Sequence, residues 1–207
     1  DDDGVVAAAD YAATAGDADT LDGAHAAAFA AAAHDHTPTQ TLVLGTGGWP
    51  ASTAGCAALA KSELPAHKID LQTFDFDKDT VEYLEFLGVM PDNWDGGRLT
   101  GRFYWTHAAA SGAFGVCWGL QGRAYADDDA LDQAWGTAQY VTDTGGTAHD
   151  LYISPETATI TLAGSTGGGR LVIFRVLRKA DDAADTLAAD ARLLCVKVEY
   201  GVSGLSA

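Results

Sequence analysis

The stretch L-T-G-R-F-Y-W-T at positions 99–106, with F-G-V-C-W-G-L-Q at 114–121, decides the fold of this chain. In both runs an apolar or small residue alternates with a polar or small one. Successive side chains of a β-strand point to opposite faces, so each run predicts a strand with one face in a core. Trp105 and Trp118 occupy apolar positions of this alternation and are expected to be core residues.

The same alternation recurs further along the chain. It places Val172, Phe174 and Val176 on one face of a third strand, and Leu194, Val196, Val198 and Tyr200 on one face of a fourth. Weaker runs predict strands near 69–76, 81–90, 138–143, 149–154 and 158–163, and the first changes phase in a way that a bulge would explain. Turn-forming Gly, Pro and Asn residues separate the runs. The expected fold class is all-β, an antiparallel β-sandwich of jelly-roll-like type.

Charge and composition exclude several functions. The 207 residues include 29 acidic and 12 basic ones, so the formal charge is 12 − 29 = −17. Such a field repels phosphate backbones, so nucleic acid is not expected as a partner. The hydrophobic share of 47% predicts a folded chain, and no apolar run is long enough to predict a membrane span. The absence of an initiator Met suggests an excerpt or a processed form.

The first part of the chain differs sharply from the rest. Residues 1–60 hold eight acidic side chains and no Lys or Arg, and they are dominated by small residues. Such a segment cannot bury a core alone, so it needs copies of itself or a partner. We expect a short, extended or partly helical stem at 1–40, a linker at 41–67, and the sandwich as a head domain at 68–207.

A more specific signal lies in the stem. Positions 16–30 read G-D-A-D-T-L-D-G-A-H-A-A-A-F-A, and positions 33–37 read A-H-D-H-T. This pattern resembles a module of tailed-bacteriophage fibre proteins, with the sequence A-D-T-L-D-G, then A-x-F-A, then H-x-H. The later runs N-W-D-G-G and W-G-L-Q-G resemble a β-sandwich region of phage and gene-transfer-agent structural proteins. The resemblance implies a homotrimeric fibre or spike whose narrow stem joins a broader head.

The stem chemistry is compatible with three-fold assembly. Leu21 and Phe29 are the only large apolar groups between Tyr11 and Leu42, and three chains around an axis could bury them together. His34 and His36, two apart in an extended segment, would project to one side. Three chains would then offer six imidazoles, which suit a transition-metal ion. The resemblance implies such a site, with iron as the native ion and zinc or nickel as alternatives. A disordered linker and an exposed His pair remain the other interpretations.

No motif for catalysis is present, so we expect no enzyme activity. Nucleophile-elbow, P-loop, zinc-protease and dinucleotide-binding signatures are missing. Glu82 and Glu85 lie three apart in an expected strand and therefore face opposite ways. A glycan-cleaving spike would need two carboxylates brought together by folding. The three cysteines form no close pair and are expected to be free thiols, with Cys117 and Cys195 in strands.

Candidate binding residues lie in turns and on the polar strand faces. Sugars stack on exposed aromatic rings, and two tryptophans are expected in polar loops with carboxylates nearby; the candidate receptor-binding residues are Trp94, Trp135, Asp127 and Asp129. A polar and aromatic sheet face, combining side chains of the two central strands, is expected to form a subunit contact. Its members are Arg102, Tyr104, Gln121, Arg123 and Tyr125, and a ligand surface is the alternative interpretation of this face.

These observations lead to one expected function, one rival and, as a lesser alternative, a glycan-cleaving spike. The expected function is a virion fibre or spike protein, on the tail or the capsid surface, that adsorbs to a bacterial surface polysaccharide or protein. Trimeric repetition would raise a weak single-site affinity through avidity. The rival is a purely architectural virion protein, such as a connector, cap or decoration, that never touches a host.

Overall fold

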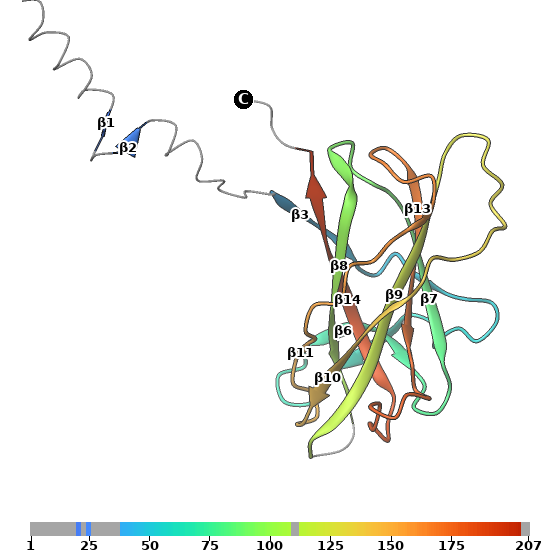
Figure 1. Ribbon diagram of the computed structural model, residues 1–207. Helices are drawn as coiled ribbons and strands as arrows, with labels where there is room; N and C mark the ends of the chain where they lie inside the picture. Colours follow the sequence, from blue (N-terminus) through green and yellow to red (C-terminus); the bar gives the residue numbers. More distant parts are fainter. Residues whose placement is uncertain (1–19, 22–23, 26–37, 109–111, 204–207) are drawn as a thin grey trace, which may run out of the picture. The chain divides into compact units, whose positions relative to one another are not determined.

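The computed structural model describes residues 20–21, 24–25, 38–108 and 112–203 (Figure 1). The chain divides into two units, Asp1–His36 and Thr37–Ala207. In the first unit, β1 (Thr20–Leu21) pairs antiparallel with β2 (Ala24–His25). Phe29 and the proposed metal ligands His34 and His36 lie outside the described residues, so the stem interpretations stay predictions.

The second unit is a sandwich of two six-stranded sheets, which confirms the predicted all-β sandwich (Figure 1). The sheet named sheet I here has the order β10-β9-β13-β7-β4, with β12 also pairing with β9. Sheet II has the order β11-β8-β14-β6-β5, with β3 also pairing with β14. The strands of sheet I are β4 (Trp49–Pro50), β7 (Glu82–Val89), β9 (Phe114–Tyr125), β10 (Gln139–Gly145), β12 (Ala163–Gly164) and β13 (Leu171–Arg178). Those of sheet II are β3 (Thr39–Leu44), β5 (Ala60–Glu63), β6 (Asp70–Phe76), β8 (Trp94–Thr106), β11 (Tyr152–Ile153) and β14 (Ala191–Val202).

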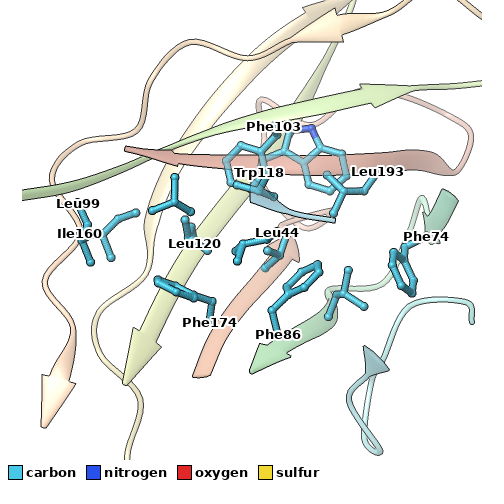
Figure 2. Packing of buried hydrophobic residues seen from close by; sticks show 14 of the residues in the cluster. Leu44, Phe74, Phe86, Leu99, Phe103, Trp118, Leu120, Ile160, Phe174 and Leu193 are labelled. Atoms are coloured by element: carbon cyan, nitrogen blue, oxygen red, sulfur yellow. The ribbon is translucent and has the colours of Figure 1, made fainter. Parts of the chain in front are cut away.

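The core lies between the two sheets and is rich in aromatic rings. Trp105 and Trp118 are fully buried, as their positions in the alternation predicted. The Trp118 ring stacks on Phe103 from the opposite sheet, with 5.5 Å between ring centroids and 13° between planes (Figure 2). Stacked and edge-on aromatic pairs add to the free energy of area burial, so this contact helps to fix one sheet against the other.

Two strands depart from simple alternation. In β6 the adjacent Thr73 and Phe74 are both buried, and the strand changes partner between them, from β5 to β14. In β14 the register shifts between Leu193 and Cys195, which places Leu193 in the core. The expectation that Leu194 faces the core is therefore wrong, because the irregularity inserts one residue into the alternation.

The segment at 41–67 is not a linker. It supplies most of β3 together with β4 and β5, so it contributes strands to both sheets. Its small residues suggested a chain without a core of its own, but Leu44 and Cys56 are buried against the sandwich. Burial raises the pKa of the Cys56 thiol to about 12. The boundary of the sandwich therefore lies at Thr37 rather than at residue 68.

One buried ion pair organises the loop between β13 and β14. The Arg178 guanidinium donates to Asp185 at 2.8 Å, and neither side chain is more than 1% exposed. Arg178 also donates to the carbonyl oxygens of Phe76, Leu187 and Ala189. A buried charge needs such complete pairing to be tolerated. Among the described residues, no helix combines the length and apolar character needed to cross a membrane.

Candidate functional site

The outer face of sheet I carries two rows of side chains that cross the strands. Residues directly opposite each other in paired strands point to the same face. The β-sheet register therefore aligns Trp49, Glu85, Arg175 and Gln121 in a first row, and Tyr83, Leu177, Gly119 and Tyr140 in a second. Leu84 and Phe86, on either side of Glu85 in β7, are buried in the core, so both rows lie on the face away from it.

Arg175 lies at the centre of the first row and is held from three sides. Its guanidinium carbon lies 4.0 Å from the Trp135 ring centroid and 5.0 Å from that of Tyr83. Its Nε donates to Oε1 of Glu85 at 2.9 Å, and its Nη2 donates to the same oxygen. A cation over an aromatic face is attracted by the ring quadrupole. Arg175 therefore fixes Glu85 and both rings in one orientation.

Trp135 reaches this position from the loop at 126–138, which two side chains of β9 hold in place. Arg123 donates to the carbonyl oxygen of Ala134 at 2.7 Å and also to the Gln133 side chain. The hydroxyl of Tyr125 donates to the carbonyl oxygen of Leu131 at 2.9 Å. The bonds to Ala134 and Gln133 end next to Trp135, so they help to position its ring.

Tyr140 lies at the other end of the second row and covers Gly119. A Cβ at Gly119 would come within 2.8 Å of the Tyr140 ring, so only glycine leaves room for the ring here. The Tyr140 side chain is nevertheless 45% exposed, and Trp49, at the start of the first row, is 44% exposed. Partial burial raises the pKa of the Tyr140 hydroxyl above its usual value. Each ring thus combines a supported position with an accessible surface.

Several polar groups in the two rows have no hydrogen-bond partner within the described part of the chain. They are the second carboxylate oxygen of Glu85, the side-chain amide of Gln121, and the hydroxyl groups of Tyr83 and Tyr140. None is among the buried polar atoms that lack a partner. These groups are available to an incoming ligand without first breaking a protein hydrogen bond. We call the two rows together with Trp135 the aromatic face.

The structure places the predicted receptor-binding residues in different environments. Trp135 belongs to the aromatic face, whereas Trp94 is only 4% exposed and lies in the core. The expectation of an exposed ring at Trp94 is wrong, because β8 begins at this residue and its pairing with Val202 turns the side chain inward. Asp127 is exposed on the 126–138 loop. The Asp129 carboxylate accepts the Ala126 amide at 2.7 Å, so it closes a turn, and this bond lowers its pKa.

The expected subunit-contact residues do not share one face. Arg102 and Tyr104 lie on β8 in sheet II, whereas Arg123 and Tyr125 lie on β9 in sheet I. The prediction of a single polar and aromatic face was wrong because neighbouring strands in the sequence belong to opposite sheets. Leu21 lies in β1 of the first unit, and its role in a subunit contact stays a prediction.

The outer face of sheet II carries ion pairs instead of exposed rings. Arg102 bridges Glu156 at 3.1 Å and Glu199 at 4.0 Å, and Lys197 pairs with Glu199 at 2.9 Å. Arg192 pairs with Asp75 at 3.2 Å on the same sheet. Within the ranges that the structure describes, no group of three His, Cys, Asp or Glu residues is arranged to hold a metal ion.

Sequence reasoning missed most of the aromatic face. Trp49 was placed in a linker, and Glu85 was considered only as half of a carboxylate pair with Glu82. Tyr83, Arg175 and Tyr140 lie at the non-core positions of predicted strands. This alternation was the feature of the sequence that could have indicated an outward-facing position for them. What the sequence does not reveal is the register that brings these positions into rows.

Comparison with known proteins returned solved structures only. No family model and no curated protein matches the chain. The similar structures include CBM35 from Cellvibrio japonicus Abf62, with 8% identity and a TM-score of 0.35, covering 79% of this chain and 99% of that one. TmCBM61, solved with β-1,4-galactotriose, has 15% identity and a TM-score of 0.34, covering 79% and 88%. CBM28, described as specific for non-crystalline cellulose, has 13% identity and a TM-score of 0.36, covering 76% and 87%. These structural neighbours are carbohydrate-binding modules, and TM-scores of this size assign no ligand to this chain.

Proposed function

We propose that the second unit is a glycan-binding head and that the aromatic face holds the glycan. The observation that carries the proposal is the β-sheet register, which gathers exposed rings and unpaired polar groups from β4, β7, β9 and β10 around Arg175 of β13. A sugar ring has apolar C–H faces and a rim of hydroxyl groups. Aromatic rings complement the faces, and the free groups of Glu85 and Gln121 complement the hydroxyls.

The dimensions of the face favour a chain of sugars over a single one. Trp49 and Gln121 are separated by three strand spacings, and so are Tyr83 and Tyr140. Adjacent strands lie about 4.8 Å apart, so each row is roughly 14 Å long. A ligand that contacts both ends of a row must therefore extend over several sugar rings, as a surface polysaccharide does.

We propose a binding role without cleavage. Glycoside hydrolysis needs two carboxyl groups, about 5 to 10 Å apart, on either side of the scissile bond. Glu85 is the one carboxylate within the two rows, and Arg175 holds one of its oxygens. This arrangement supports recognition of hydroxyl groups rather than proton transfer.

In its biological setting we propose that the head serves a virion fibre or spike in adsorption to a bacterial surface. The support is the resemblance of the stem at 16–37 to phage-fibre modules. A homotrimer would present three aromatic faces, and their avidity would compensate for a weak single site. We further propose that His34 and His36 of three chains hold one transition-metal ion. Metal analysis of the purified protein, with the His34→Ala/His36→Ala variant as control, tests this: one ion per three chains supports the clamp, and a metal-free trimer contradicts it.

The experiment that tests the head is a glycan array probed with the full chain and with Trp135→Ala. The proposal expects saturable binding to a defined polysaccharide by the full chain and loss of most of that binding in the variant. Tyr104→Leu, on the opposite sheet, is the matched control and should bind normally. Binding that is unchanged in Trp135→Ala would place the glycan elsewhere.

An architectural role is the second candidate, and one observation favours it. Leu87 and Val89, on the outer face of β7 beside the rows, are 55% and 60% exposed. Exposed aliphatic groups of this kind are typical of surfaces that contact other proteins. An array without any bound glycan, together with tight binding to another virion protein, would favour this role.

A further inference from the structure

We infer that the glycan held by the aromatic face is uncharged, an inference that rests on the proposed glycan-binding function. The argument comes from the charges at the face, from the charge of the whole chain, and from the groups left free for a ligand.

The cations near the face are already neutralised or engaged. Arg175 is paired with Glu85, and its guanidinium is covered by the Trp135 and Tyr83 rings. Lys179, whose charge acts on Tyr140, pairs with Asp181 at 2.9 Å and lies 3.9 Å from Asp182. A carboxylate or phosphate on a sugar needs an unpaired cation as a strong partner. Neither cation offers a free charge at this face.

Arg123 is committed to the loop rather than to a ligand. Its guanidinium donates to the Ala134 carbonyl oxygen and to the Gln133 side chain, and these bonds hold the segment that carries Trp135. If an anion took over these donors, the loop would lose its attachment to β9. Arg123 therefore positions Trp135 and does not form an anion site.

Most cations of the sandwich are paired in the same way, and within the described residues the two without a carboxylate inside 4.0 Å are Arg123 and Arg170. All 12 basic residues lie at or beyond Lys61, and ten of them form ion pairs within 4.0 Å; the ten are Lys61, Lys68, Lys78, Arg98, Arg102, Arg175, Arg178, Lys179, Arg192 and Lys197. The chain retains a formal charge of −17. Its summed field therefore repels a polyanionic chain as it approaches, most strongly at low ionic strength.

The groups left free are suited to neutral hydroxyls. The Gln121 amide and the hydroxyls of Tyr83 and Tyr140 are uncharged donors and acceptors, and the free oxygen of Glu85 accepts from a hydroxyl. A uronate placed in the same position would bring its carboxylate next to that oxygen. Like charges at this distance disfavour binding, so Glu85 selects against acidic sugars as well as for hydroxyl groups.

The first test compares acidic and neutral polymers of galactose-type sugars, using the full-length chain; polygalacturonate and its methyl ester are the pair matched in backbone. Polygalacturonate, its methyl ester and galactan are bound to the protein at about 10 mM and at about 500 mM salt. We expect the neutral polymers to bind with an affinity that changes less than about twofold with salt, and the acidic polymer to bind at least tenfold more weakly at low salt. Tight binding of polygalacturonate alone would overturn this inference but leave a glycan-binding head. Binding to none of these polymers or to a wider neutral and acidic panel would remove the proposed function and this inference together.

The second test changes the charge at the face. Glu85→Gln leaves Arg175 unpaired, so it should raise the affinity for polygalacturonate at low salt at least threefold. Glu63→Gln is the matched control, because it changes the net charge equally but removes an exposed pair with Lys68 on the other sheet. Equal effects of the two variants would show that only the global field matters and would overturn the role assigned to Glu85.

Discussion

The two outer faces of the sandwich cover the same core but are built from different chemistry. Sheet II carries ion pairs that join neighbouring strands, such as Arg102 with Glu199 and Arg192 with Asp75. The outer face of sheet I carries exposed rings around the ion pair of Arg175 with Glu85. Solvated ion pairs contribute little to stability and bind water well. Exposed rings in a fixed arrangement favour sheet I as the surface that binds the glycan in the proposed function.

The largest expected effect comes from the buried ion pair at the end of sheet I. Asp185→Asn leaves the Arg178 guanidinium charged and buried without its partner, which should lower the free energy of unfolding by about 3–5 kcal/mol. Urea denaturation measures the loss. Glu63→Gln removes an exposed pair and should change stability by less than about 1 kcal/mol. Similar losses in both variants would contradict the role of burial.

A second prediction compares how substitutions on the two faces change the affinity for glycan. Trp135→Leu should weaken glycan binding about tenfold, which corresponds to roughly 1.4 kcal/mol, because the ring is lost while the loop keeps an apolar side chain. Tyr104→Leu on sheet II should leave affinity within about twofold. Calorimetric titration with the best array glycan gives both values. A larger loss in Tyr104→Leu would move the binding site to sheet II.

A smaller effect is expected when the ring is kept but its support is removed. Arg123→Met deletes the hydrogen bonds to Ala134 and Gln133. Since a typical hydrogen bond contributes about 1 kcal/mol, affinity should fall roughly fivefold with little change in the unfolding midpoint. Faster hydrogen exchange at 126–138 than in the parent protein would report the loosened loop. Unchanged affinity would mean that the loop needs no attachment to β9.

The smallest effect concerns thiols and involves no loss of function. Cys117 on sheet I is buried, whereas Cys195 on sheet II is half-buried. Burial raises the pKa of both thiols, so at pH 8 each is mostly protonated and reacts slowly. Iodoacetamide should label Cys195 before Cys117, and Cys56 after global unfolding only. Mass spectrometry of peptides from the folded protein reports the order.

The strands were largely predictable from the sequence, whereas the site was not. Alternation identified the runs around Phe103 and Trp118 because large apolar residues alternate there with small or polar ones. The site depends on which strand lies beside which, and Trp49 meets Glu85 only through long-range pairing of β4 with β7. At Trp94 a prediction from local sequence was wrong. Its polar neighbours suggested an exposed side chain, but β8 begins at this residue and the side chain is buried in the core.

The two ends of the sandwich meet. The Val202 amide donates to the carbonyl oxygen of Pro38 at 3.0 Å, where the first and last strands of this unit run together. Entry and exit points so close make a domain easy to splice into another polypeptide, because the host needs only a narrow gap in one of its surface loops. The sandwich is therefore suited to insertion into a surface loop of an unrelated protein, because its two ends need little separation in the host backbone.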